Sequence, residues 1–123
     1  MTHNAQLLTP EIRDALLRNG RLREQYLRAG LAEPDFLPVV KLFTPDSDCV
    51  WLLTELDPHE PDIAFGLCDL GMGYPELGSV SITELEAVRG GLRLPIERDL
   101  RFTPTKTLSA YADEASKAGA IQA

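Results

Sequence analysis

Two apolar runs joined by a short connection constrain the fold of this chain most. They are residues 49–56 (CVWLLTEL) and residues 63–70 (IAFGLCDL), and each has the length and residue types of a β-strand. Only six residues separate the runs, whereas a crossover between parallel strands needs a dozen or more. We therefore expect the two runs to pair as antiparallel neighbours.

Further strands are expected on both sides of this pair. Residues 36–43 contain Val39, Val40 and Leu42, and a turn-forming cluster at 44–48 follows them. A glycine-rich loop at 71–78 leads to a fourth strand near Ser79 and Val80. Residues 100–102 are expected to form one more short strand.

Helix signals bracket the expected sheet. Thr9 and Pro10 predict a helix start, Asn19-Gly20 predicts its end, and residues 21–28 suggest a second short helix. Ser81 and Glu84 form a capping-box pattern before a short helix near 82–89, with Ile82, Leu85 and Val88 facing the sheet and Gly90-Gly91 ending it. An alanine-rich C-terminal helix spans about 108–118, with Thr107 or Ser109 as its cap.

These elements predict an α+β fold in one domain covering residues 1–123. It would have a small, mostly antiparallel sheet of about four strands, with an N-terminal helix, a short capped helix and a C-terminal helix. We expect residues 1–8 and 119–123 to be flexible.

Charge is distributed unevenly along the chain, whose net charge is −7. Residues 42–88 contain no Lys or Arg, so this stretch should generate a negative field and disfavour direct binding to nucleic acid. A solvated acidic face that only aids solubility is the alternative. The stretch contains ten acids: Asp46, Asp48, Glu55, Asp57, Glu60, Asp62, Asp69, Glu76, Glu84 and Glu86.

A protein partner with a basic surface fits this charge pattern. In the loop GMGYPELG, Tyr74, Pro75 and Leu77 would give an apolar patch beside Glu76, which suits recognition of a protein. The loop has no following lysine, so a phosphate cradle is not indicated. The residues expected to bind the partner are Asp57, Glu60, Asp62, Tyr74, Glu76 and Glu86.

An enzyme is the alternative reading. The segment DPHEPD, residues 57–62, offers four oxygen or nitrogen ligands, but it lacks the spacing of an EF-hand and also suits a plain surface loop. A small metal-dependent hydrolase or nuclease would use Glu55, Asp57, His59 and Glu76. A pair of Glu55 with Glu76 or Glu97 would serve acid/base catalysis only if buried together. We assign no catalytic residue, metal ligand or cofactor.

The stretch ELEAVRGGLRLPIERDLRF, residues 84–102, is rich in both acids and arginines. Glu86 and Arg89 are three positions apart and are expected to pair across one helical turn. We expect Arg89, Glu97, Arg98 and Asp99 to form structural ion pairs that tie the short helix to the last strand.

Cellular location is suggested by what the sequence lacks. No apolar run approaches the ~20 residues that span a bilayer, and the first residues do not resemble a signal peptide. Cys49 and Cys68 lie in apolar runs and are expected to be buried free thiols. A cytoplasmic protein without membrane contact follows as the expectation; the sequence leaves its oligomeric state open.

Spaced motifs between Lys41 and Phe102 carry a resemblance to a known family. They are KxFTP, a WxxTE strand, PELG, SxxELExVRG and LxIERDxxF. In these motifs the chain resembles, from about Leu7 to Leu108, a family of small bacterial proteins classed as a domain of unknown function. Members are often encoded on plasmids and other mobile elements, among accessory genes that include anti-restriction proteins. This context, taken together with the ten acids and the absence of Lys and Arg in residues 42–88, leads us to expect an anti-defence accessory protein, of the anti-restriction or anti-CRISPR kind, that occupies a basic surface of a nucleic-acid-handling protein.

Overall fold

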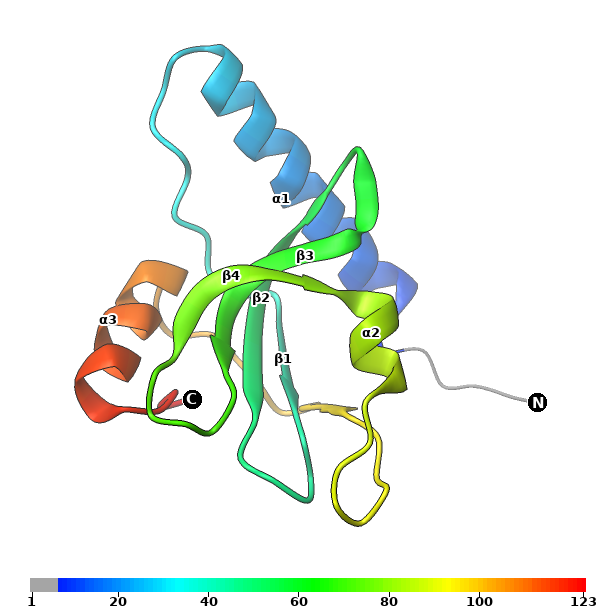
Figure 1. Cartoon of the computed structure of the whole chain (residues 1–123). Helices are drawn as coiled ribbons and strands as arrows, with labels where there is room; N and C mark the ends of the chain where they lie inside the picture. The colour runs from blue at the N-terminus through cyan, green and yellow to red at the C-terminus, as the bar shows by residue number, and fades with distance from the viewer. Residues whose placement is uncertain (1–6) are drawn as a thin grey trace.

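A five-stranded antiparallel sheet forms the centre of the molecule in the computed structural model, which describes residues 7–123 (Figure 1). The strand order is β4-β3-β2-β1-β5, so consecutive strands from β1 to β4 are neighbours. The predicted α+β class with a small antiparallel sheet is confirmed. The strands are β1 (Val40–Phe43), β2 (Val50–Asp57), β3 (Glu60–Asp69), β4 (Glu76–Ser81) and β5 (Glu97–Arg98); the helices are α1 (Pro10–Arg28), α2 (Ile82–Ala87) and α3 (Leu108–Ala118).

The β2–β3 hairpin is the predicted antiparallel pair. Its register extends from Val50 opposite Asp69 to Asp57 opposite Glu60, so the connection shrinks from the expected six residues to the two-residue turn Pro58-His59. The Asp57 carboxylate accepts the backbone N–H of His59 at 2.9 Å, which stabilises this turn.

A bulge in β2 changes which side chains face each side of the sheet. Leu53 pairs with Gly66, but the next pair is Glu55 with Phe65, so Thr54 is an extra residue in β2. Since side chains alternate along a strand, one extra residue reverses the alternation. Glu55 therefore lies on the same face as Leu52 instead of the face that carries Leu53.

Helix α1 is longer than the sequence suggested. The expected break at Asn19-Gly20 is wrong, because the helix continues through both residues to Arg28. Gly20 packs directly against β2: a Cβ at this position would lie 2.0 Å from the carbonyl oxygen of Leu56. Asn19 donates to the carbonyl of Thr54 at 2.9 Å. The glycine thus permits a close contact between helix and strand and does not end the helix.

The start of α1 follows the sequence prediction. Thr9 has an extended backbone, and its hydroxyl accepts the N–H of Ile12 at 3.1 Å, with Pro10 at the first helical position. At the other end, Ala29 follows the helix, and residues 29–38 form a loop.

Helix α2 is shorter than expected. It ends at Ala87, and Val88 is 38% exposed, so only Ile82 and Leu85 of the three expected residues are buried. The Ser81 hydroxyl accepts the N–H of Glu84 at 3.2 Å, the first half of the predicted capping box. The Ser81 hydroxyl in turn donates a hydrogen bond to Asp62 at 2.5 Å.

The last strand also lies elsewhere than expected. Residues 97–98 form β5, which pairs with Leu42 and Phe43 of β1, whereas residues 100–102 lie outside any strand. Arg89 forms an isolated antiparallel bridge with Pro95, so the chain between α2 and β5 doubles back on itself.

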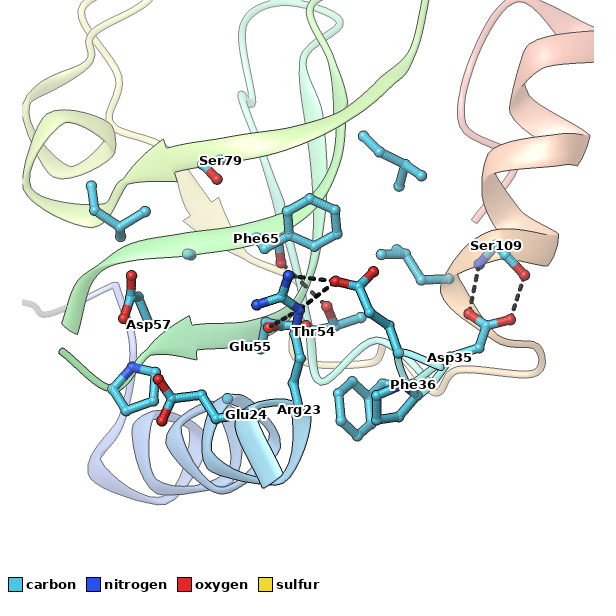
Figure 2. Close-up of a pocket in the computed structure, with 18 of the residues that line it drawn as sticks. Arg23, Glu24, Asp35, Phe36, Thr54, Glu55, Asp57, Phe65, Ser79 and Ser109 are labelled. Carbon is cyan, nitrogen blue, oxygen red and sulfur yellow. Dashed lines mark hydrogen bonds and ion pairs between the residues drawn. The ribbon is translucent and has the colours of Figure 1, made fainter. Parts of the chain in front are cut away.

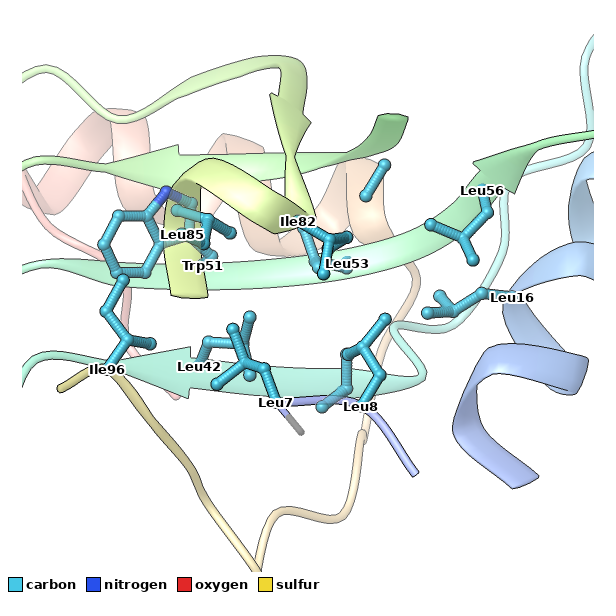
Figure 3. Packing of buried hydrophobic residues seen from close by; sticks show 12 residues of the cluster. Leu7, Leu8, Leu16, Leu42, Trp51, Leu53, Leu56, Ile82, Leu85 and Ile96 are labelled. Atoms are coloured by element: carbon cyan, nitrogen blue, oxygen red, sulfur yellow. The ribbon is translucent and has the colours of Figure 1, made fainter. Parts of the chain in front are cut away.

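Two apolar clusters cover the two faces of the sheet. The larger one lies between the sheet, α1 and α2 and includes Leu42, Trp51, Leu53 and Ile82 (Figure 3). The smaller one is centred on Leu52, Leu67, Leu108, Tyr111 and Ala115, beneath α3. Helix α3 begins after Thr107, which makes no side-chain capping bond.

Both ends of the described chain have defined contacts. Of the segment 1–8 expected to be flexible, residues 1–6 lie outside the described residues, whereas Leu7 and Leu8 are buried. At the other end, the N–H of Ile121 donates to Asp69 at 3.0 Å and Lys41 donates to the Ala123 carbonyl at 2.6 Å.

The two cysteines are free and partly buried. Burial raises the pKa of the Cys68 thiol, and the negative charge of Glu76 adds to the effect. Among residues 7–123, every helix is too short or too polar to cross a bilayer.

Candidate functional site

A cavity of about 600 Å³ opens beside the β2–β3 hairpin (Figure 2). Its wall is assembled from α1, the loop after α1, the hairpin, β4 and the first residues of α3. We call it the Glu55 cavity. It is lined by Gly20, Arg23, Glu24, Glu33, Pro34, Asp35, Phe36, Thr54, Glu55, Asp57, Pro58, His59, Ile63, Ala64, Phe65, Leu77, Ser79, Leu108 and Ser109.

Glu55 is the most unusual residue of the wall. It is only 9% exposed, and no hydrogen bond to its carboxylate occurs within residues 7–123. The nearest cation is Arg23, whose Nε lies 3.6 Å from Glu55 Oε2 (Figure 2). Burial raises the pKa of Glu55; the Arg23 charge opposes this rise, and the charges of Glu33 and Asp57 add to it.

Arg23 forms a closer ion pair with a second carboxylate, that of Glu33. Its Nε donates to Glu33 at 2.9 Å, and its Nη2 contacts the same oxygen. Arg23 projects from α1 and Glu33 from the loop that follows it, so this pair holds the loop against the helix. The 3.6 Å contact with Glu55 is longer than a charge-assisted hydrogen bond, so Glu55 gains only part of the available stabilisation from Arg23.

Two further contacts hold the rim in place. The backbone N–H of Ser109 donates to Asp35 at 3.1 Å, and the Ser109 hydroxyl binds the other oxygen of Asp35 (Figure 2). Burial acts against ionisation of Asp35, but these hydrogen bonds prevail and lower its pKa. Opposite them, His59 Nε2 lies 2.5 Å from Glu24 and joins the hairpin turn to α1. The loop, α3 and the hairpin are thereby fixed around the opening.

The wall combines negative charge with apolar surface. Five acids, Glu24, Glu33, Asp35, Glu55 and Asp57, face one cation, Arg23, which leaves a formal charge of −4 when His59 is neutral. Phe36, Phe65, Ile63, Leu77 and Leu108 supply the apolar part. A cavity of this composition suits a cationic group on an apolar stem better than an anion.

The residues expected to bind a partner fall into two groups. Asp57, Glu60 and Asp62 lie at the hairpin turn, whereas Glu76 starts β4 opposite Cys68. Cys68 is six residues along β3 from Asp62, a distance of roughly 20 Å. Tyr74, in the loop before Glu76, is 82% exposed and lies with the second group. The structure therefore does not gather the six residues on one small patch.

The first group is extended by α2. Asp62 accepts from the hydroxyls of Ser81 and Thr83 and from the N–H of Thr83, which places the start of α2 beside the hairpin. These hydrogen bonds lower the pKa of Asp62, and the bond from Ser81 has the largest effect. We call this region the acidic end; its acids are Asp57, Glu60, Asp62, Glu84 and Glu86.

The residues of the alternative, enzymatic reading are only partly assembled. Glu55, Asp57 and His59 line the cavity, but Glu76 does not. Glu97 lies on the opposite edge strand, so neither expected carboxylate pair with Glu55 is formed. Within residues 7–123, no group of three or more His, Cys, Asp or Glu side chains is arranged to hold a metal ion.

The predicted ion pairs in residues 84–102 have a different geometry. Arg89 donates to the carbonyls of Glu86 and Val88, at 3.0 and 2.7 Å, and Arg98 donates to the Leu7 carbonyl at 2.6 Å. Asp99 contacts Lys41 of β1 at 3.5 Å. In the part of the chain that the structure describes, Arg89, Glu97 and Arg98 form no ion pair. The arginines bind backbone carbonyls instead of carboxylates.

Most residues of the cavity carry no recognisable signal in the sequence. Arg23 looks like an ordinary helix residue in the sequence, and Ser109 was expected only as a possible helix cap. One feature of the sequence could have indicated Glu55: it is the only charged residue inside the apolar run 49–56. A lone acid in a strand that is otherwise buried needs a partner, a solvent path or a ligand.

Comparison with known proteins identifies the family of this chain. The family described as protein of unknown function, DUF2958, matches residues 7–122. A search of curated proteins and a search of solved structures each found no match. The match covers nearly the whole chain, and the chain therefore belongs to the DUF2958 family of proteins of unknown function.

Proposed function

We propose that this protein is a non-enzymatic interaction protein that binds a basic surface of a nucleic-acid-handling protein. The observation that carries the proposal is the acidic end. The segment without Lys or Arg folds into adjacent strands and α2, so five of its ten acids lie on neighbouring elements at the acidic end.

The acids of the acidic end are available to a partner. Within residues 7–123 none of the five forms an ion pair with Lys or Arg at 4.0 Å or less. Glu60, Glu84 and Glu86 are exposed, and the Glu86 carboxylate accepts the N–H of Leu7 at 3.2 Å. Unpaired surface carboxylates attract basic proteins and speed their association.

The narrower proposal is an anti-defence role. Proteins that handle nucleic acid bind phosphates with clustered Lys and Arg. A protein that presents carboxylates to such a cluster would compete with the nucleic acid. An anti-restriction or anti-CRISPR protein would act in this way, by blocking the partner's substrate site without cutting or modifying anything.

A charge-neutralised variant tests the proposal. A partner recovered from bacterial lysate on the immobilised protein would be purified and titrated against the wild type and two variants. The first neutralises the acidic end, and the second removes the same number of charges elsewhere, both changing the net charge from −7 to −4. The variants are E60Q/E84Q/E86Q and the control D48N/E97Q/D113N, whose three exposed acids lie on the β1–β2 turn, β5 and α3.

The expected partner is a basic protein whose binding is displaced by DNA or RNA. The acidic-end variant should bind about tenfold more weakly, and the control should bind like the wild type. Recovery of partners without a basic surface, or equal losses in both variants, would contradict the proposal.

A further inference from the structure

We propose that the Glu55 cavity is a binding site for a cationic group, a guanidinium or an alkylammonium, carried on an apolar stem. This site is independent of the proposed function, because its lining does not include the exposed acids Glu60, Glu84 and Glu86. The cavity combines a space of about 600 Å³ with a buried carboxylate, that of Glu55, which accepts no hydrogen bond from the described residues.

The state of Glu55 indicates a missing donor. Glu55 is 9% exposed, and carboxylates at such positions normally accept several hydrogen bonds. Glu55 has only the 3.6 Å contact with Arg23, whose Nε is already bonded to Glu33 at 2.9 Å. A cation entering the cavity would donate to Glu55 directly, and Arg23 would keep its bond to Glu33.

The β2 bulge places this carboxylate in the cavity. If β2 were regular and Thr54 were paired, the alternation along the strand would direct Glu55 to the face of Leu53, into the larger apolar cluster. With the bulge, Glu55 pairs with Phe65 and lines the cavity together with that ring. Bulges that redirect a side chain in this way are common next to binding sites.

The negative charge of the cavity wall favours a cation over an anion. Around the cavity, five carboxylates face one guanidinium that already contacts two of them. An anion would have to approach these carboxylates in a partly desolvated space, where repulsion is weakly screened. A cation instead gains from each of them.

The apolar part of the cavity wall favours a ligand whose cationic group is carried on an apolar stem. Phe36 and Phe65 provide aromatic surface beside the carboxylates, and Leu77 and Ile63 continue the apolar lining. A cation near a ring face gains a further attraction, and a chain of methylene groups is well accommodated by such a wall. The chemistry is shared by a free alkylamine and by an arginine or lysine side chain of another protein.

Small probes that differ in charge test the site. We would titrate the protein with n-butylguanidinium, with neutral pentanamide and with anionic pentanoate, following backbone amide shifts by NMR. The cation is expected to bind at millimolar concentration and to shift the amides of Thr54, Glu55 and Phe65. Pentanoate binding at these residues, or no response to the cation, would overturn the proposal.

Glu55→Gln isolates the contribution of the carboxylate. Glutamine has the same shape without the charge, so cation affinity should fall about tenfold while the fold is retained. Glu97→Gln, on the opposite edge of the sheet, removes the same charge and should leave the affinity unchanged. Equal affinity in wild type and E55Q would refute the assignment.

A second variant keeps the test valid if E55Q fails to fold. Ser79 is exposed at the cavity wall on β4 (Figure 2), so Ser79→Arg would place a tethered guanidinium there and exclude the probe. Undiminished binding by a folded S79R would count against the proposal.

Comparison with the tripeptide acetyl-Gly-Arg-Gly-amide distinguishes the two sources of the cation. Tighter binding of the tripeptide than of butylguanidinium would identify a protein side chain, and weaker binding would identify a free amine. The E60Q/E84Q/E86Q variant should bind the probes normally, so failure of the acidic-end proposal and failure of this one can be told apart.

Discussion

Replacing Gly20 with alanine should destabilise the protein, although alanine is the better helix former. In an exposed helix the change would stabilise by about 1 kcal/mol. Here the new Cβ would lie 2.0 Å from the Leu56 carbonyl oxygen, 3.2 Å from its carbon and 3.3 Å from Pro58 Cδ. Because the closest atom is backbone, it cannot rotate away, and α1 must move from β2.

The size of the effect follows from the required movement. Ordinary contact begins at 3.4 Å, so the Leu56 oxygen distance must grow from 2.0 Å by about 1.4 Å. A shift of this size breaks the bond from Asn19 to the Thr54 carbonyl, now 2.9 Å, at a cost of about 1 kcal/mol. Overpacking adds about 1–3 kcal/mol. After the helix-propensity gain, the free energy of unfolding should fall by about 2 kcal/mol.

Thermal and urea unfolding, followed by circular dichroism, would measure the change. The expected loss lowers Tm by about 8 °C for a chain of this length. Gly91→Ala is the matched control, because a Cβ there meets no atom within 4 Å, and its stability should change by less than about 0.5 kcal/mol. A G20A protein as stable as the wild type would refute the assigned role of Gly20 in helix–strand contact.

Three further predictions concern the core, a buried bond and the cavity. Leu53→Ala, at a fully buried position, should lower the free energy of unfolding by about 2–5 kcal/mol in urea titrations. Arg98→Ala removes the 2.6 Å bond to the Leu7 carbonyl and should cost about 1–2 kcal/mol, whereas exposed Arg89→Ala should cost less than about 0.5 kcal/mol; similar losses would contradict this difference. Because the pKa of Glu55 is raised above the ordinary 4.5, the folded state holds this proton more tightly than the unfolded state. The stability of the wild type relative to E55Q should therefore be highest below pH 4.5 and fall as pH rises above it, and a constant or rising difference in urea titrations would contradict the burial of this charge.

Local patterns were sufficient to predict the hairpin and most helix starts. The apolar runs and their short connection determine the β2–β3 pairing, and Thr9-Pro10 marks the start of α1 through contacts within one turn. The predictions failed where contacts with a distant segment of the chain determine the local structure. Asn19-Gly20 has the sequence of a helix end, yet the glycine is required by a strand more than thirty residues later in the chain. Likewise, β5 forms at residues 97–98 because β1 offers a free edge there.

The cavity could not be predicted for the same physical reason. Its lining extends from Gly20 to Ser109, and five separate segments have to pack before the space exists. The sequence showed only that Glu55 is a lone acid in an apolar strand. Which face it occupies depends on the bulge at Thr54, and a bulge is defined by the partner strand as well as by its own.

The acidic end and the Glu55 cavity meet at Asp57, which belongs to the first and lines the second. A basic partner that placed one arginine in the cavity would therefore lay its neighbouring positive charges against the hairpin turn. The acidic end and the cavity would contribute to partner binding with different salt dependence. Exposed charges are screened over a Debye length of about 8 Å at physiological ionic strength, whereas a buried ion pair is screened far less. Raising the salt concentration should remove the loss caused by E60Q/E84Q/E86Q but preserve the loss caused by E55Q. If both losses disappear together, the partner binds the surface alone, and the cavity serves a free amine.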